Sequence, residues 1–93
     1  MSDEHDRLKE REQAHLARQL LEHPLWVEAW TMLETGLRDA WENSQIDDIP
    51  GREAIYLQLD AAKTVRRHFE SLVQTGEFAE LQLEERSDGR RSH

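Results

Sequence analysis

The chain has 93 residues, of which 34% are charged and 37% hydrophobic, with no cysteine and a formal net charge of -8. This length suits one small domain, and the charge opposes general nucleic-acid affinity, which depends on cationic side chains that neutralise phosphates. A cysteine-free chain has no disulfide framework and no thiolate chemistry, and no apolar run approaches the ~18 residues of a membrane span.

The amino-acid usage predicts an all-α fold. Leu, Ala, Glu, Gln and Arg dominate, Gly and Pro are scarce, and no stretch alternates apolar and polar residues for long enough to indicate a strand. We expect a small helical bundle, in which an antiparallel helical hairpin is accompanied by an N-terminal helix and a short C-terminal helix. A single helical domain is predicted over residues 1–86, with residues 1–12 frayed and residues 87–93 forming a flexible tail.

The first helix is expected near residues 3–22. Its first half offers only Leu8 for burial, whereas its second half carries Leu16, Ala17, Leu20 and Leu21. Pro24 suits the first position of a helix and disrupts a helix interior. A second helix is therefore predicted to begin at Pro24 and to run to about residue 43, and a continuous helix with a kink at the proline is the alternative.

The second and third helices each carry an apolar face with three-four spacing, which is typical of helix packing. A loop rich in turn-forming residues, 43–51, separates them, and the third helix is expected over residues 52–75, where Thr75-Gly76 ends or bends it. Folding at this loop pairs Leu33 with Ala62. We predict a core seam made of ten residues: Trp26, Trp30, Leu33, Leu37, Trp41, Ile55, Ala62, Val65, Phe69 and Leu72.

After Gly76, a short C-terminal helix is predicted near residues 77–84, where Phe78, Leu81 and Leu83 would lie on the hairpin. Asp48, in the loop, is expected to cap or turn the chain before Pro50. The tryptophans of the seam have two interpretations: a core that this small domain needs, which we favour, and an aromatic docking surface, since Trp is enriched in interface hot spots.

A basic strip with an aromatic residue runs beside the seam of the third helix. It consists of Arg52, Tyr56, Leu59, Lys63, Arg66 and Arg67. The strip is a candidate partner-binding surface for an acidic partner, a phosphate backbone or an acidic part of another copy of the chain. The alternative, which we favour, is a solvated face paired with Asp60 and Glu70, whose exposed ion pairs contribute about 0–1 kcal/mol each.

No catalytic, cofactor-binding or metal-binding residues are predicted. The five histidines form no close ligand pair, and tetrahedral zinc needs three or four converging ligands. A helical hairpin offers little room for the water-poor pocket that an acid-base pair needs. The chain is therefore expected not to be an enzyme and to bind no cofactor.

Two long stretches, "RQLLEHPLWVEAWTMLETGLRDAWENS" and "GREAIYLQLDAAKTVRRHFESLVQTGEFAELQL", resemble a group of small bacteriophage and prophage proteins encoded among head-assembly and packaging genes. The resemblance spans roughly residues 17–83. Its matched points are Pro24, the aromatic residue at 30, Gly51-Arg52-Glu53, Val65-Arg66 and Thr75-Gly76. It implies a setting in the host cytoplasm or in the virion, and it implies no activity and no functional residues.

Two function hypotheses follow. The first is a non-enzymatic, homo-oligomeric helical protein, most simply a dimer, that contacts a phage structural protein in virion assembly or structure. The second is a small acidic inhibitor or adaptor that binds a host or phage nucleic-acid enzyme. A terminase-like DNA-binding subunit is a weaker third possibility, because the net charge opposes it. Direct nucleic-acid binding and membrane insertion are not expected.

Overall fold

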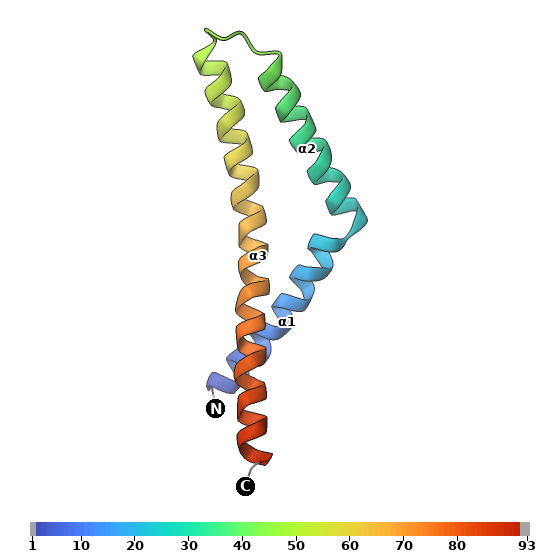
Figure 1. The fold of residues 1–93 in the computed structure, drawn as a ribbon, viewed down its shortest axis with the longest axis vertical. Helices are drawn as coiled ribbons and strands as arrows, with labels where there is room; N and C mark the ends of the chain where they lie inside the picture. Colours follow the sequence, from blue (N-terminus) through green and yellow to red (C-terminus); the bar gives the residue numbers. More distant parts are fainter. Residues whose placement is uncertain (1, 92–93) are drawn as a thin grey trace. The chain divides into compact units, whose positions relative to one another are not determined.

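The computed structural model describes the backbone of residues 2–91 and the side chains of residues 3–86. Three helices account for nearly all of it: α1 (Ser2–Glu22), α2 (Pro24–Glu42) and α3 (Ile49–Arg91) (Figure 1). Residues 2–91 contain no strand. The predicted all-α fold is therefore confirmed for the part of the chain that the structure describes.

The break between α1 and α2 is made by His23 and Pro24. His23 has an extended backbone, with φ -65° and ψ 130°, and its Nδ1 accepts a hydrogen bond from the Leu25 backbone N–H at 3.1 Å. Pro24 occupies the first turn of α2, where a missing N–H costs nothing because that group has no partner within the helix. The predicted start of the second helix at Pro24 is confirmed.

Asp48 caps the start of α3. The Gly51 backbone N–H donates to Asp48 Oδ1 at 3.1 Å, and the Arg52 N–H donates to the Asp48 carbonyl oxygen at 3.0 Å. These bonds satisfy donors that lack partners at a helix N-terminus. The capping role predicted for Asp48 is confirmed, although α3 begins at Ile49, three residues before the expected start.

The predicted end of the third helix at Thr75-Gly76 is wrong. α3 spans 43 residues, from Ile49 to Arg91, so the expected short C-terminal helix near 77–84 is part of α3 and not a separate element. Glycine commonly ends a helix by adopting positive φ, but no glycine of the described chain has positive φ. α3 also includes residues 87–91 of the predicted tail, and residues 92–93 of that tail lie outside the described part. Flexibility of the tail remains a prediction. Fraying of residues 1–12 also remains a prediction.

The chain divides into two compact units, and α3 contributes to both. The first unit combines α1, up to Leu21, with the part of α3 that starts at His68; the second contains residues 22–67. The single domain that was expected over residues 1–86 from length remains a prediction.

In the first unit, α1 packs against α3 through very small residues. Ala14 and Ala17 on α1 are 1% and 4% exposed, Ala79 on α3 is fully buried, and Gly76 is buried beside it. Both pairs are spaced three residues apart, which places each pair on one face of its helix. A Cβ added to Gly76 would overlap Ala14 Cβ and would lie 2.9 Å from the Glu10 carbonyl oxygen. Gly76 thus permits the close approach of the two helices.

Polar contacts surround this crossing. Arg18 on α1 donates to the Glu77 carboxylate on α3 at 3.0 Å, and both side chains are substantially exposed. Within α1, Arg7 pairs with Glu10 at 2.6 Å. Exposed pairs of this kind contribute about 0–1 kcal/mol each, so the small residues at the centre determine how closely the helices pack.

In the second unit, α2 and the first part of α3 are joined by a loop at residues 43–48. Arg52 fixes one side of this loop: its Nε donates to Ser44 Oγ at 2.9 Å, and Ser44 Oγ donates to the Trp41 carbonyl oxygen at 2.6 Å. The Arg52 guanidinium also lies over the Trp41 ring, 4.6 Å from its centroid. The start of α3 is thereby tied to the end of α2.

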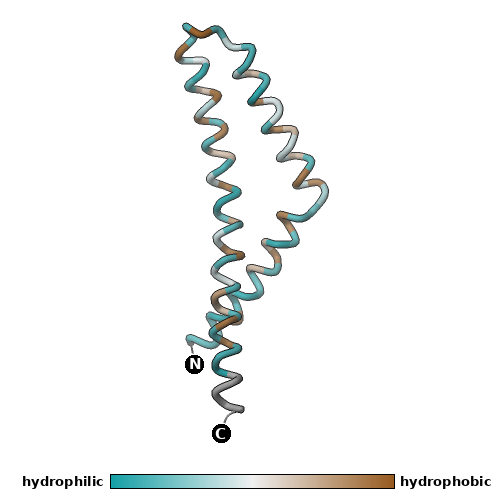
Figure 2. Tube along the Cα trace, viewed as in Figure 1, coloured by the Kyte–Doolittle hydropathy of each residue, from teal (hydrophilic) through white to brown (hydrophobic). Residues whose placement is uncertain are grey.

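Little apolar surface is enclosed by this fold. Among the described side chains, the buried hydrophobic residues are Leu37 and the three alanines of the first unit. Figure 2 shows that the apolar positions are distributed along the helices and also occur in the loop before α3. None of the helices within residues 2–91 combines the length and the apolar character that crossing a membrane requires.

Candidate functional site

A groove of about 400 Å³ lies between α2 and α3 in the second unit. Its apolar lining comes from both helices and consists of Leu37, Trp41, Ile55, Tyr56 and Leu59. Leu37 is buried, but Trp41 is 45% exposed and Tyr56 is 62% exposed. Large aromatic side chains with this much exposure leave apolar area available for a partner.

The charged residues of this α2/α3 groove are Glu34, Arg38 and Lys63. Arg52 adds a further positive charge nearby, because its guanidinium stacks on the Trp41 ring. Cations outnumber the single acid around an apolar lining. This combination favours a partner that presents apolar side chains beside carboxylates.

The groove unites residues that the sequence placed in two different sets. Leu37, Trp41 and Ile55 belong to the predicted core seam, whereas Tyr56, Leu59 and Lys63 belong to the predicted basic strip. On α3, the core seam and the basic strip are neighbouring faces of the helix. A groove that borders both faces therefore includes residues of both sets. Neither set coincides with the groove as a whole.

The other seam residues differ in their exposure. Leu33 and Val65 are 40% and 53% exposed. The remaining members are half-buried: Trp26, Trp30, Ala62, Phe69 and Leu72. Leu37 is therefore the one predicted seam residue that is buried among the described side chains.

The remaining basic strip residues make contacts outside the groove. The Arg66 guanidinium lies over the Trp30 ring, 4.9 Å from its centroid, and Trp30 in turn stacks with Trp26 at 6.2 Å between ring centroids. Arg67 lies 3.9 Å from the Asp60 carboxylate, and both side chains are more than half exposed. Two of the strip's cations thus have intramolecular partners within reach.

The Trp30 indole has intermediate exposure. Its Nε1 is shielded from solvent and has no hydrogen-bond partner among the described residues. A shielded indole N–H without an acceptor costs free energy. The ring is thus held by stacking with Trp26 and Arg66 and by apolar contact.

Two groove residues, Glu34 and Arg38, were missed by the sequence analysis. Each lies three residues before a seam residue, Leu37 and Trp41 respectively, and the two are four residues apart. Residues three and four apart are neighbours on a helix surface. Their spacing therefore placed Glu34 and Arg38 along one side of the apolar face of α2. Which side of that face borders a groove depends on where α3 packs, and the sequence does not show this.

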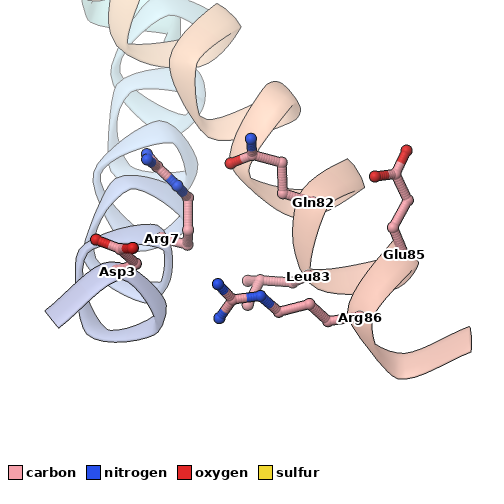
Figure 3. A pocket seen from close by; sticks show the side chains of 6 residues that line it. All are labelled: Asp3, Arg7, Gln82, Leu83, Glu85 and Arg86. Atoms are coloured by element: carbon pink, nitrogen blue, oxygen red, sulfur yellow. The ribbon is translucent and has the colours of Figure 1, made fainter. Parts of the chain in front are cut away.

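Two further hollows lie in the first unit, and both are lined mainly by charged side chains. One, of about 390 Å³, lies between the start of α1 and the end of α3; Figure 3 shows Leu83 and Arg86 directed toward α1, whereas the Glu85 carboxylate points away from it. The other, of about 610 Å³, is lined by Leu8, Arg11, Glu12, His15, Arg18 and Glu80. Apolar lining is small in both, so the α2/α3 groove is the better candidate for a protein-binding site.

A metal site needs converging ligands, and an acid-base pair needs an enclosed cavity. Within the described residues, no group of three or more His, Asp or Glu side chains is placed to hold a metal ion. The carboxylates nearest the candidate groove, such as Glu34, stand on the surface of two helices and not in an enclosed cavity. The groove is an open hollow between two helices, with a mainly apolar lining.

Comparison with known proteins gives no further constraint: no protein family matches the chain, and no curated protein or solved structure is significantly similar to it.

Proposed function

We propose that this chain is a non-enzymatic helical protein that acts through protein–protein contacts, in the assembly or structure of a bacteriophage virion, and that it associates with itself. The observation that carries the proposal is the imbalance between buried and exposed apolar side chains. Among the described residues, fifteen large hydrophobic side chains are exposed, whereas the buried hydrophobic residues are three alanines and Leu37.

This imbalance favours association because small domains already have a thin stability margin. Covering apolar surface contributes about 25 cal/mol for each Å² removed from water. Leu16 and Leu20, in the first unit, are 57% and 36% exposed, and Leu57, in the second unit, is 57% exposed. A second copy that covers such residues supplies stability that the isolated chain lacks, and a two-fold dimer is the simplest assembly.

The second unit is proposed to be an antiparallel hairpin of α2 and the first part of α3. Two contacts support this arrangement. Arg52 lies over Trp41 near the loop, and Arg66 lies over Trp30 farther from it. As residue numbers rise along α3 they fall along α2, which is the order expected of antiparallel helices joined by a short loop.

The virion setting rests on the resemblance of residues 17–83 to small phage and prophage proteins of head-assembly and packaging gene clusters. In this setting the chain works in the host cytoplasm or as a part of the virion, and its second partner is a phage structural protein. The exposed apolar side chains are compatible with contact to such a protein, since large exposed apolar patches mark protein interaction sites.

One measurement tests self-association. Light scattering coupled to size exclusion, at high micromolar protein concentration, is expected to give a mass well above the 11.0 kDa of one chain. Raising the salt concentration should lower this mass, because exposed charge pairs are screened over about 10 Å at 0.1 M ionic strength. A mass of one chain in both buffers would contradict self-association.

An acidic inhibitor or adaptor of a nucleic-acid enzyme is the second candidate, and one observation favours it. From His68 to Glu85, α3 contains five Glu and neither Lys nor Arg, a density of negative charge that an enzyme's phosphate-binding surface would attract. Co-purification from phage-producing cells separates the two candidates. Capsid or portal proteins would support the assembly role, and a nuclease or polymerase would support the inhibitor.

A further inference from the structure

The charge of α3 is divided along its length. Residues 52–67 contain four Lys or Arg and two acids, whereas residues 68–85 contain five Glu and no Lys or Arg. Both stretches belong to one continuous helix. The basic stretch of one copy therefore attracts the acidic stretch of another, and like stretches repel.

The acidic stretch also presents apolar side chains to solvent. Phe78 and Leu81 are 60% and 58% exposed and lie three residues apart, on one face of α3. Gly76 and Ala79 lie on the opposite face, which is buried against α1. We use the name acidic ridge for Phe78, Leu81, Glu84 and Glu85, all of which are exposed.

The acidic ridge and the α2/α3 groove have complementary chemistry. The groove combines an exposed apolar lining, including Trp41 and Tyr56, with Arg38 and Lys63. The ridge combines two exposed apolar side chains with two carboxylates. An amphipathic helix bound in a groove anchors through apolar residues three or four apart, and Phe78 and Leu81 have this spacing.

We propose that the α2/α3 groove binds the acidic ridge of a second copy of this chain. Phe78 and Leu81 then cover the apolar lining of the groove, and Glu84 and Glu85 lie near Lys63 and Arg38. The proposal rests on the proposed self-association and names the surfaces that carry it. Because the contact joins two different surfaces, a dimer closes only when each copy fills the groove of the other; otherwise the contact continues into a longer assembly.

Charge reversal tests the pairing. Lys63→Glu in the groove and the double variant Glu84→Lys/Glu85→Lys in the ridge should each weaken self-association at least about tenfold, measured by sedimentation over a range of concentrations, because each places like charges across the contact. The matched control is Lys9→Glu, which makes the same charge change at an exposed position of α1. The control should weaken self-association less than about threefold, since it adds only to the overall repulsion.

Mixing the two charge variants gives the sharper result. In a mixed dimer, one contact joins the groove that carries Lys63→Glu to the ridge that carries the introduced lysines, so opposite charges meet again. The other contact joins the native ridge of the first chain to the native groove of the second chain. The mixture is expected to recover association to within about threefold of the wild type. Helix content and melting temperature measured on each variant separate a loss of pairing from a loss of folding.

Three results would overturn the pairing. The first is a wild-type chain that self-associates, combined with a Lys63→Glu variant whose self-association is weakened no more than that of Lys9→Glu. This result would support self-association and contradict the contact between groove and ridge. The second is a mixture no tighter than its components. The third is a wild-type chain that remains monomeric at all concentrations, which would end both self-association and the pairing.

Discussion

Gly76 of α3 approaches Ala14 of α1 so closely that a single methyl group on the glycine would overlap the alanine Cβ. Gly76→Ala is therefore expected to force the two helices apart and to lower the free energy of unfolding by about 1–3 kcal/mol, the usual cost of overpacking. Urea denaturation followed by circular dichroism measures the change.

Gly36→Ala is the matched control for this substitution. Gly36 is also inside a helix, but a Cβ added there meets nothing within 4 Å. Its replacement should stabilise the protein by about 0.5–1 kcal/mol, because glycine loses more backbone entropy than alanine in a helix. If both variants are stabilised equally, the close helix approach at Gly76 is wrong.

The cap at the start of α3 gives a second prediction. Asp48→Ala removes the oxygen that accepts from the Gly51 N–H, and it should cost about 1 kcal/mol of stability. Asp47→Ala is the neighbouring control, since the hydrogen bond from the Ile49 N–H goes to the Asp47 backbone carbonyl, which alanine keeps. That control should stay within about 0.5 kcal/mol of the wild type.

Trp30→Ala should cost about 3 kcal/mol, the lower end of the range for large-to-small changes, because the indole is half-buried. It removes stacking with both Trp26 and Arg66. Trp41→Ala is the contrasting variant: its side chain is 45% exposed in the groove, so it should change self-association more than the stability of the single chain. Near-identical melting of Trp30→Ala and wild type would favour the docking interpretation of that tryptophan.

The antiparallel hairpin predicts that positions 33 and 62 lie close together. The chain has no cysteine, so Leu33→Cys/Ala62→Cys contains a single pair of thiols. Mild oxidation is expected to join them within one chain, which reducing and non-reducing mass analysis detects. Mixed single-cysteine variants report any disulfide between chains. Failure of the double variant to form an intrachain bond would contradict the hairpin register.

Features fixed by local chemistry were predictable from the sequence, and features fixed by packing were not. Pro24 and Asp48 act through their own backbone and side chain, so Pro24 indicated the start of α2 and Asp48 indicated a cap or turn before Pro50, although the start of α3 itself was expected three residues too late. A glycine such as Gly76 looks the same in the sequence whether it ends a helix or lies at a close contact between two helices. The informative pattern was the pair Gly76 and Ala79, matched by Ala14 and Ala17, but its meaning depends on which helices meet.

The groove was predictable in part for the same reason. Helical spacing identified Trp41, Ile55 and Tyr56 as members of the faces that border it. It could not show that Trp41 stays 45% exposed beside Arg52, because that exposure depends on how closely α2 and α3 approach. Residues such as Glu34 and Arg38 become part of a site only because α2 and α3 lie at this distance from each other.

The crossing of α1 with α3 also has a consequence for the order of folding during synthesis. The residues that cover Ala14 and Ala17 lie near the other end of the chain, and the Arg18–Glu77 contact joins positions 59 residues apart. α1 is synthesised before its partner surface on α3, which emerges only after α2 and the loop. Contacts that are distant in sequence form slowly, so the nascent chain is expected to complete the second unit first and to carry α1 unpaired until Ala79 has emerged.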